Sequence, residues 1–242
     1  MTGTMGDIVT TLFGESAQTV DIVILLTILT LLPSILLMLT GFTRILIVLS
    51  FVRNALGMQQ TPPNQVLIGL ALFLTLFVMM PVFDIIYEDA YVPFTNQEIT
   101  QDEFIDRAMY PFRRWMFAQV DDSDLNFFIS LSDLDFGTDA NGNLLPEYLD
   151  DENNIRQELI PDMVLIPAFL TSEIKQAFWI GFIIFIPFIV IDMIVASTLM
   201  AMGMMMLPPA MISLPFKVLL FVLVDGWQLI IGALIESFMR YT

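Results

Sequence analysis

Four long apolar segments constrain the fold of this chain more than any other feature. They cover residues 22–51, 66–87, 177–207 and 210–235. Each reaches the length of about 20 residues that a helix needs to cross a bilayer. Because backbone groups find no water in hydrocarbon, helices are expected there rather than open strands. Only 14% of residues are charged, against about 25% in soluble proteins, so the sequence predicts an all-α integral membrane protein.

The apolar segments pair into two helical hairpins, each with a short polar or methionine-rich tip. The first tip reads "RNALGMQQTPPNQ" and the second "GMMMLPP". Each contains a glycine followed by two prolines, a pattern that ends one helix and begins another. The residues of this hairpin-tip motif are Arg53, Asn54, Gln59, Gln60, Pro62, Pro63, Pro208 and Pro209.

An acidic domain separates the two hairpins. Residues 88–173 contain 19 acidic residues and four arginines, a charge that repels nucleic acid and anionic lipid. We therefore divide the chain into an N-terminal polar segment (1–21), a first hydrophobic hairpin (22–87), the acidic domain (88–174), a second hydrophobic hairpin (175–235) and a C-terminal tail (236–242). Within the acidic domain, Thr100 and Glu103 have the spacing of a capping box and predict a helix start.

The composition argues against metal, cofactor and catalytic chemistry. Histidine and cysteine are both absent, which excludes disulfides, imidazole acid–base catalysis and the usual zinc sites. The stretch "DLDFGTDANGNLLPEYLDDEN" looks like a calcium loop. Aligning Gly142 with the sixth loop position, however, puts Gly137 and Tyr148 where carboxylates are required. We interpret the stretch as an Asn-Gly turn and expect no metal site, no cofactor and no enzymatic activity.

Charged residues inside the apolar segments are the first candidate functional group. Arg44, Asp192, Lys217 and Asp225 lie there, and a charge at the bilayer centre costs about 2.5–3.5 kcal/mol on insertion scales. Folding the second hairpin about Leu207 places Asp192 near the depth of Asp225, with Lys217 about one turn closer to the tip, and this favours an Asp192–Lys217 pair within or between subunits. Three interpretations remain open: buried ion pairs that fix packing and assembly, a proton or ion path, and charges that reach water at the membrane edge. Lys217 and Asp225 share one predicted helical face, which Gln228, Gly232 and Glu236 extend.

The methionines of the second tip are the other candidate site. Met204, Met205 and Met206 are consecutive and are followed at once by Leu207 and two prolines. Methionine is unbranched and adapts its shape, so it suits surfaces that repack. Such side chains can line a hydrophobic constriction that closes by excluding water, or they can be ordinary apolar filler facing lipid or core.

Charge does not fix the orientation of the chain. Arg53 favours a cytoplasmic first tip, whereas Lys175 and Arg240 would then lie outside, against the positive-inside rule. The first 16 residues contain no Lys or Arg, so they lack the basic region of a signal peptide.

Two long stretches resemble the FliP (SctR-type) family of core export-gate proteins of the flagellar type III secretion system. They are "FTRILIVLSFVRNALGMQQTPPNQVLIGLALFLT" (42–75) and "IGFIIFIPFIVIDMIVASTLMAMGMMMLPPAMISLPFKVLLFVLVDGWQ" (180–228). The phrases "EDAYVPF" and "LIPAFLTSEIKQAF" in the acidic domain are also similar to that family. The resemblance implies kinked hairpins that assemble as a spiral or ring: five copies with FliQ-like and FliR-like subunits around a pore, completed by FlhB-like and FlhA-like proteins.

The resemblance also implies a role and a location. Met204, Met205 and Met206 match the family's methionine motif, which closes the pore as a gasket around unfolded protein cargo. The expected location is the bacterial inner membrane, in contact with its lipid, within the flagellar basal body and with the acidic domain in the periplasm. Two alternatives remain open: the homologous subunit of a virulence injectisome, and an ion- or proton-conducting channel. An intramembrane aspartyl protease is not supported, because neither "VIDM" nor "LVDG" supplies the Gly-x-Gly-Asp setting that such enzymes use.

Overall fold

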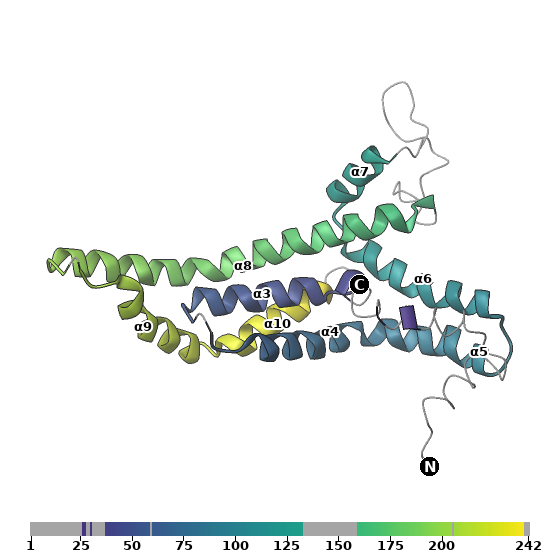
Figure 1. Cartoon of the computed structure of the whole chain (residues 1–242), viewed down its shortest axis with the longest axis horizontal. Helices are drawn as coiled ribbons and strands as arrows, with labels where there is room; N and C mark the ends of the chain where they lie inside the picture. Colours follow the sequence, from purple (N-terminus) through teal and green to yellow (C-terminus); the bar gives the residue numbers. More distant parts are fainter. Residues whose placement is uncertain are drawn as a thin grey trace, which may run out of the picture. The chain divides into compact units, whose positions relative to one another are not determined.

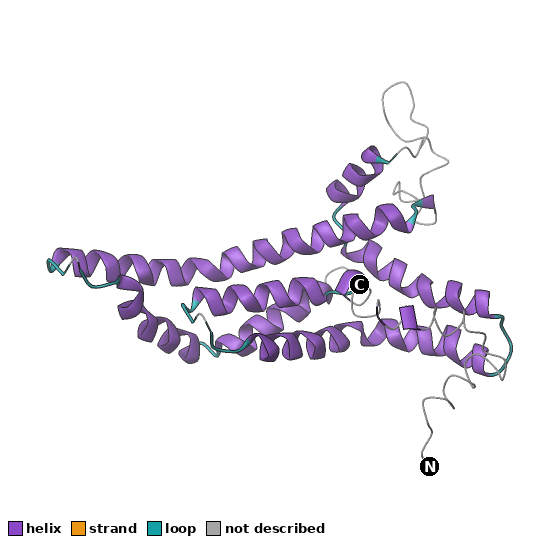
Figure 2. Ribbon diagram, viewed as in Figure 1, coloured by secondary structure: helices purple, strands orange, loops and turns teal. Residues whose placement is uncertain are grey.

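The computed structural model describes residues 26, 27, 30, 37–58, 60–132, 159–204 and 206–239. The chain divides into two compact units, residues 1–38 and 39–242. The described residues of the first unit are Leu26, Thr27, Thr30, Leu37 and Met38, and all of them are helical. In the second unit, every described residue with regular secondary structure is also helical (Figure 2), which confirms the all-α prediction for this part of the chain.

The first hairpin consists of α3 (Phe42–Ala55) and α4 (Asn64–Ile86). Helix α4 continues through a π-helical turn (Tyr87–Tyr91) into α5 (Val92–Thr95). Helix α3 packs along the much longer α8 (Figure 1). The approach is close at Gly181 of α8, where an added Cβ would lie 2.6 Å from the ring of Phe51.

After α5, the described part of the acidic domain contains α6 (Gln101–Gln119) and α7 (Asp122–Leu131), and its end forms the start of α8. The predicted capping box at the start of α6 is confirmed. The Thr100 side chain accepts from the Glu103 backbone N–H, and the Glu103 carboxylate accepts from the Thr100 backbone N–H. The stretch interpreted as an Asn-Gly turn lies outside the described residues.

The second hairpin consists of α8 (Asp162–Ala201), α9 (Pro209–Leu223) and α10 (Gly226–Met239). Helix α8 has 40 residues and passes through Pro167 and Pro187 without ending. The last apolar segment, predicted as one continuous helix, is instead broken after Leu223, and its two halves are bent by 64°. Asp225 has a left-handed φ of 50° at the break. Gly226 follows it, and an added Cβ there would lie 2.4 Å from the ring of Phe221.

Among the described residues, two or three helices are able to cross a membrane. By length and composition, Asn64–Thr95 and Asp162–Ala201 qualify, and the bent pair α9 and α10 adds a third if it counts as one broken span. Helix α3 has only 14 residues, and most of the preceding apolar segment lies outside the described residues. Four crossings are therefore not confirmed, and the domain boundaries remain predictions.

Candidate functional site

The methionine tip lies between the end of α8 and the start of α9. Helix α8 ends at Ala201, and Gly203 takes a left-handed φ of 75° that turns the chain. Met206 is 98% exposed and Met204 is 44% exposed, so neither is buried in the core of its own chain. Met205 lies outside the described residues. Pro208 precedes α9 and Pro209 is its first residue, as the Pro-Pro pattern predicts.

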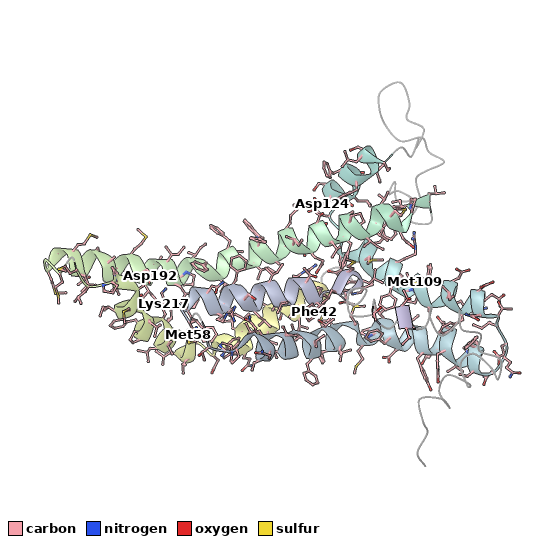
Figure 3. The ribbon with its side chains drawn as sticks, in the orientation of Figure 1. Phe42, Met58, Met109, Asp124, Asp192 and Lys217 are labelled. Atoms are coloured by element: carbon pink, nitrogen blue, oxygen red, sulfur yellow. The ribbon has the colours of Figure 1, made fainter. Side chains whose placement is uncertain are left out.

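Asp192 and Lys217 form an ion pair that joins α8 to α9 behind this tip. The Lys217 Nζ donates to Asp192 Oδ2 over 2.6 Å, and Ser213 Oγ donates to Asp192 Oδ1 over 2.5 Å. Figure 3 shows the two labelled side chains close together between the two helices. The Lys217 side chain is only 7% exposed. The predicted pair is thus confirmed, and it forms within one chain.

An apolar cavity of about 430 Å³ lies between the same two helices, towards the tip. Its lining comes from the last turns of α8 and the first turns of α9 and consists of Ile191, Ile194, Val195, Thr198, Leu199, Met202, Ile212 and Phe216. The second hairpin is therefore held by an ion pair but is not tightly packed near its end.

Arg44 is the centre of a second, fully buried polar network. Its Nε donates to Glu173 Oε2 over 3.0 Å, and one Nη donates to the other carboxylate oxygen. Further donations reach Ser237 Oγ (3.2 Å) and Gln119 Oε1 (3.3 Å). The guanidinium carbon lies 4.1 Å from the centre of the Phe238 ring. Arg44 and Glu173 are both 0% exposed, so this is a charge pair removed from water.

The partners of Arg44 come from three other helices. Glu173 lies on α8, Gln119 ends α6, and Ser237 and Phe238 lie on α10. Gln119 also donates through Nε2 to the Phe238 carbonyl oxygen over 3.0 Å. The network therefore joins both hairpins and the acidic region at one point. Sequence reasoning singled out Arg44 but missed Glu173 and Gln119; the only available signal was Glu173 directly before the third apolar segment.

The first tip is held by Arg53, a residue of the predicted tip motif. Its Nη1 donates to Asn64 Oδ1 over 2.5 Å and to the Pro62 carbonyl oxygen over 3.4 Å. Pro63 is the N-cap of α4. Gln60 and Asn54 are exposed, and Gln59 lies outside the described residues. The motif thus closes the α3–α4 connection.

Asp225 and Lys217 do not share one helical face, because the chain breaks between them. Lys217 points inward to Asp192, whereas Asp225 is exposed at the break. Asp225 instead begins an outer groove of about 510 Å³ along α10, which Val224, Gln228, Leu229, Gly232, Ala233 and Glu236 also line. The prediction that Gln228, Gly232 and Glu236 share a face with Asp225 is therefore confirmed, whereas the prediction that Lys217 lies on the same face is wrong.

Two further ion pairs fasten the acidic region to α8. Asp124 of α7 accepts from Lys175 Nζ and from Ser172 Oγ, both over 2.8 Å; Figure 3 shows Asp124 where α7 approaches α8. Arg113 of α6 pairs with Asp162 and donates to the Ile160 carbonyl oxygen over 2.7 Å. Partial burial lowers the pKa of Arg113.

The described residues contain no group of three or more His, Cys, Asp or Glu that could hold a metal ion. Each ion pair among these residues joins side chains of two different helices. The fold and these sites therefore define a helical membrane protein, and its candidate functional features are an exposed methionine tip, ion pairs between helices and exposed helix faces.

Comparison with known proteins identifies the family. The FliP family model matches residues 25–234. The flagellar biosynthetic protein FliP of Pectobacterium carotovorum subsp. carotovorum is 52% identical over 93% of this chain and 81% of its own length. That of Bacillus subtilis (strain 168) is 50% identical over 92% of this chain and 93% of its own length. That of Buchnera aphidicola subsp. Acyrthosiphon pisum is 49% identical over 90% of this chain, which spans only 53% of that relative. The chain belongs to the FliP family of flagellar biosynthetic proteins.

Proposed function

We propose that this chain is the core pore-forming subunit of the flagellar type III protein export gate. In this role it passes unfolded flagellar proteins through a central channel. The observation that carries the proposal is its identity of about 50% with flagellar biosynthetic proteins FliP over most of its length. That match favours a flagellar subunit over the related injectisome subunit.

The methionine tip is the proposed gasket of the channel. Met206 projects almost completely from its own chain, and Met204 is partly exposed. A seal for many different unfolded sequences must deform, stay apolar and bind nothing tightly. Methionine meets these demands better than stiff β-branched side chains. The apolar cavity behind the tip leaves space for the hairpin end to adjust.

The ion pairs are proposed to set the packing of the subunit rather than to conduct protons. Both oxygens of Asp192 accept hydrogen bonds from groups of the same chain. The Asp192 side chain is 37% exposed, but both of its oxygens are already engaged. The Arg44 and Glu173 side chains are 0% exposed, which removes that pair from any path to water.

The proposed assembly contains five copies of the chain with FliQ-like and FliR-like subunits, and FlhB-like and FlhA-like proteins complete the gate. The proposed location is the inner membrane within the flagellar basal body, with the acidic domain on the periplasmic side. The two or three apolar helical spans support a membrane location.

Replacing Met204, Met205 and Met206 with alanine tests the gasket. We expect the purified complex to keep its subunit stoichiometry, while conductance of small ions through the closed gate in planar bilayers rises above the wild-type level. The matched control replaces three exposed methionines away from the tip, Met80, Met163 and Met193, and should leave the bilayer tight. A tip variant that seals as well as wild type refutes the gasket role.

A further inference from the structure

Helix α10 has two faces of different character. Its inner face consists of Gly226, Ile230, Leu234 and Phe238, which recur every four residues and are buried against the rest of the chain. Its outer face carries the groove of about 510 Å³ that begins at Asp225. The yellow ribbon of α10 in Figure 1 runs beside α3 and α4, which cover the inner side.

The outer groove combines carboxylates with large exposed apolar groups. Asp225 and Glu236 lie along it, Gln228 lies between them, and Leu229 is 62% exposed. None of the ion pairs among the described residues involves Asp225 or Glu236. Carboxylates on an apolar helix face protein or water rather than lipid. The groove also exposes the apolar side chains of Val224 and Leu229 beside these carboxylates, and this combination is suited to contact with another protein.

The described cations of the apolar helices are engaged within their own chain, which argues against a second copy in the groove. Of the nine lysines and arginines, Arg44, Lys217, Lys175 and Arg113 are paired with carboxylates of their own chain. Arg53 is held in the first tip by Asn64. The remaining described cations, Arg107 and Arg114, lie on α6 and not on an apolar helix. A second copy therefore offers no unengaged cation on a described apolar helix.

Gly232 indicates that the occupant of the groove is a helix. It lies in the middle of the groove, and nothing lies within 4 Å of the position that its Cβ would take. Small residues at such positions let two membrane helices approach closely. Gly232 has no such packing role within its own chain.

We propose that the outer face of α10 is the docking surface for a transmembrane helix of a different chain, one that carries lysine or arginine opposite Asp225 and Glu236. This inference rests on the proposed function, because it requires a gate built from unlike subunits. The inference goes beyond the proposed function because it assigns the surface of this chain to which a basic helix of a companion subunit binds.

Photo-crosslinking from the groove tests the proposal in the otherwise intact protein. Leu229 is replaced by p-benzoylphenylalanine, which suits an exposed apolar position, in full-length chain co-expressed with differently tagged FliQ-like and FliR-like subunits. We expect a crosslink to one of these companions, at a residue in an apolar helix that contains Lys or Arg. A crosslink to a second copy of this chain, or none to any protein, overturns the proposal.

Substitutions in the groove give an independent readout. The double variant Asp225→Lys, Glu236→Lys should reduce the companion recovered per copy of this chain by about tenfold, because it replaces attraction with repulsion. Gly232→Leu should reduce recovery in the same direction by filling the contact. Gly69→Leu on α4, whose Cβ position is equally open, is the matched control and should retain the companion.

The outcomes separate this inference from the proposed function. If wild-type chain and companions form no complex at all, the proposed function fails. If the wild-type complex forms and the groove variants keep wild-type amounts of companion, the docking surface alone is refuted. If the variants fail to accumulate in the membrane, the crosslink from position 229 still tests whether a companion helix lies in the groove.

Discussion

Removing the Arg44 charge should destabilise this protein more than removing any exposed charge. In Arg44→Met, the Glu173 carboxylate stays buried at 0% exposure and loses both of the hydrogen bonds that it accepts from Arg44. Breaking a buried ion pair from one side costs about 3–5 kcal/mol. We expect Arg44→Met at the upper end of that range.

The reverse substitution should cost less. In Glu173→Gln, the Arg44 guanidinium keeps Gln119, Ser237 and the Phe238 ring as partners. We therefore expect a loss near 3 kcal/mol, the lower end of the same range. The double variant Arg44→Met, Glu173→Leu removes both charges and should recover most of the stability, because apolar replacement of a whole buried pair is often neutral.

The ion pair between Lys175 and Asp124 provides the matched control. The Lys175 side chain is 53% exposed, and exposed pairs contribute only about 0–1 kcal/mol. Lys175→Met should therefore change the stability little, although it also removes one charge from α8.

Thermal unfolding in detergent, followed by tryptophan fluorescence, measures these differences. Trp115 lies 6.1 Å from the Phe238 ring and 5.3 Å from the Phe169 ring, so its emission reports on the region around Arg44. With about 2–4 °C per kcal/mol for a chain of this size, a loss at the upper end of the range means that Arg44→Met should lower the Tm by about 10–20 °C. A shift no larger than that of Lys175→Met, or a double variant as unstable as the two single losses added, would refute the reasoning.

Two further predictions concern helix packing and pH. Gly181→Ala should destabilise the α3–α8 contact by about 1–3 kcal/mol, because its Cβ meets the Phe51 ring; Gly69→Ala, where the space is open, should show no loss in the same thermal assay. Backbone and side-chain hydrogen bonds from Thr100 lower the pKa of Glu103, so the cap stabilises α6 above the ordinary carboxylate pKa and loses this effect as pH falls through the lowered value. Hydrogen exchange of the first α6 amides, corrected for the intrinsic pH dependence, should show this loss of protection in acid, and Glu103→Gln, which removes the titrating carboxyl group, should abolish it; equal pH dependence in both proteins would contradict the assignment.

The sequence predicted the Asp192–Lys217 contact because it depends on local geometry. Once a hairpin folds about a Pro-Pro tip, residues at similar distances from the tip come near each other. Asp192 lies 15 residues before Leu207 and Lys217 lies 10 residues after it, so the count brings the two to within about one and a half helical turns. The positions of the apolar segments and of the helix-breaking residues are thus enough to predict a contact between two helices that are neighbours in the chain. The Thr100 capping box is predictable for the same reason, since both partners lie within one helical turn.

The Arg44 network was not predictable in this way. Glu173 is 129 residues from Arg44 and Gln119 is 75 residues away, and no local pattern connects them. Glu173 also belonged, by composition, to the acidic domain, where charge suggests exposure to solvent. Glu173 is buried because α3 packs against α8 and places Arg44 beside it.

The break between α9 and α10 escaped prediction because apolar composition does not record backbone direction. Asp225 and Gly226 stand in an otherwise apolar run, and a left-handed φ at a non-glycine residue is not visible in hydropathy. The consequence is functional, since the break turns Asp225 away from Lys217 and onto the outer face of α10.

Two ion pairs hold α8, which is longer than a bilayer requires, to its neighbouring helices: the Arg44–Glu173 pair is fully buried and the Asp192–Lys217 pair is partly buried. Its 40 residues extend about 60 Å, about twice the hydrocarbon thickness of about 30 Å. Glu173 and Asp192 are 19 residues apart, or about 28 Å, and each joins α8 to another helix at that point, α3 through Arg44 and α9 through Lys217. If α8 slid along its axis, at least one ion pair would have to break or move into the hydrocarbon of the bilayer, and both changes cost free energy. The pairs therefore fix the position of α8 against both hairpins, and the stretch between them, which carries one charge at Lys175 near its start, has about the length of the hydrocarbon core of a bilayer.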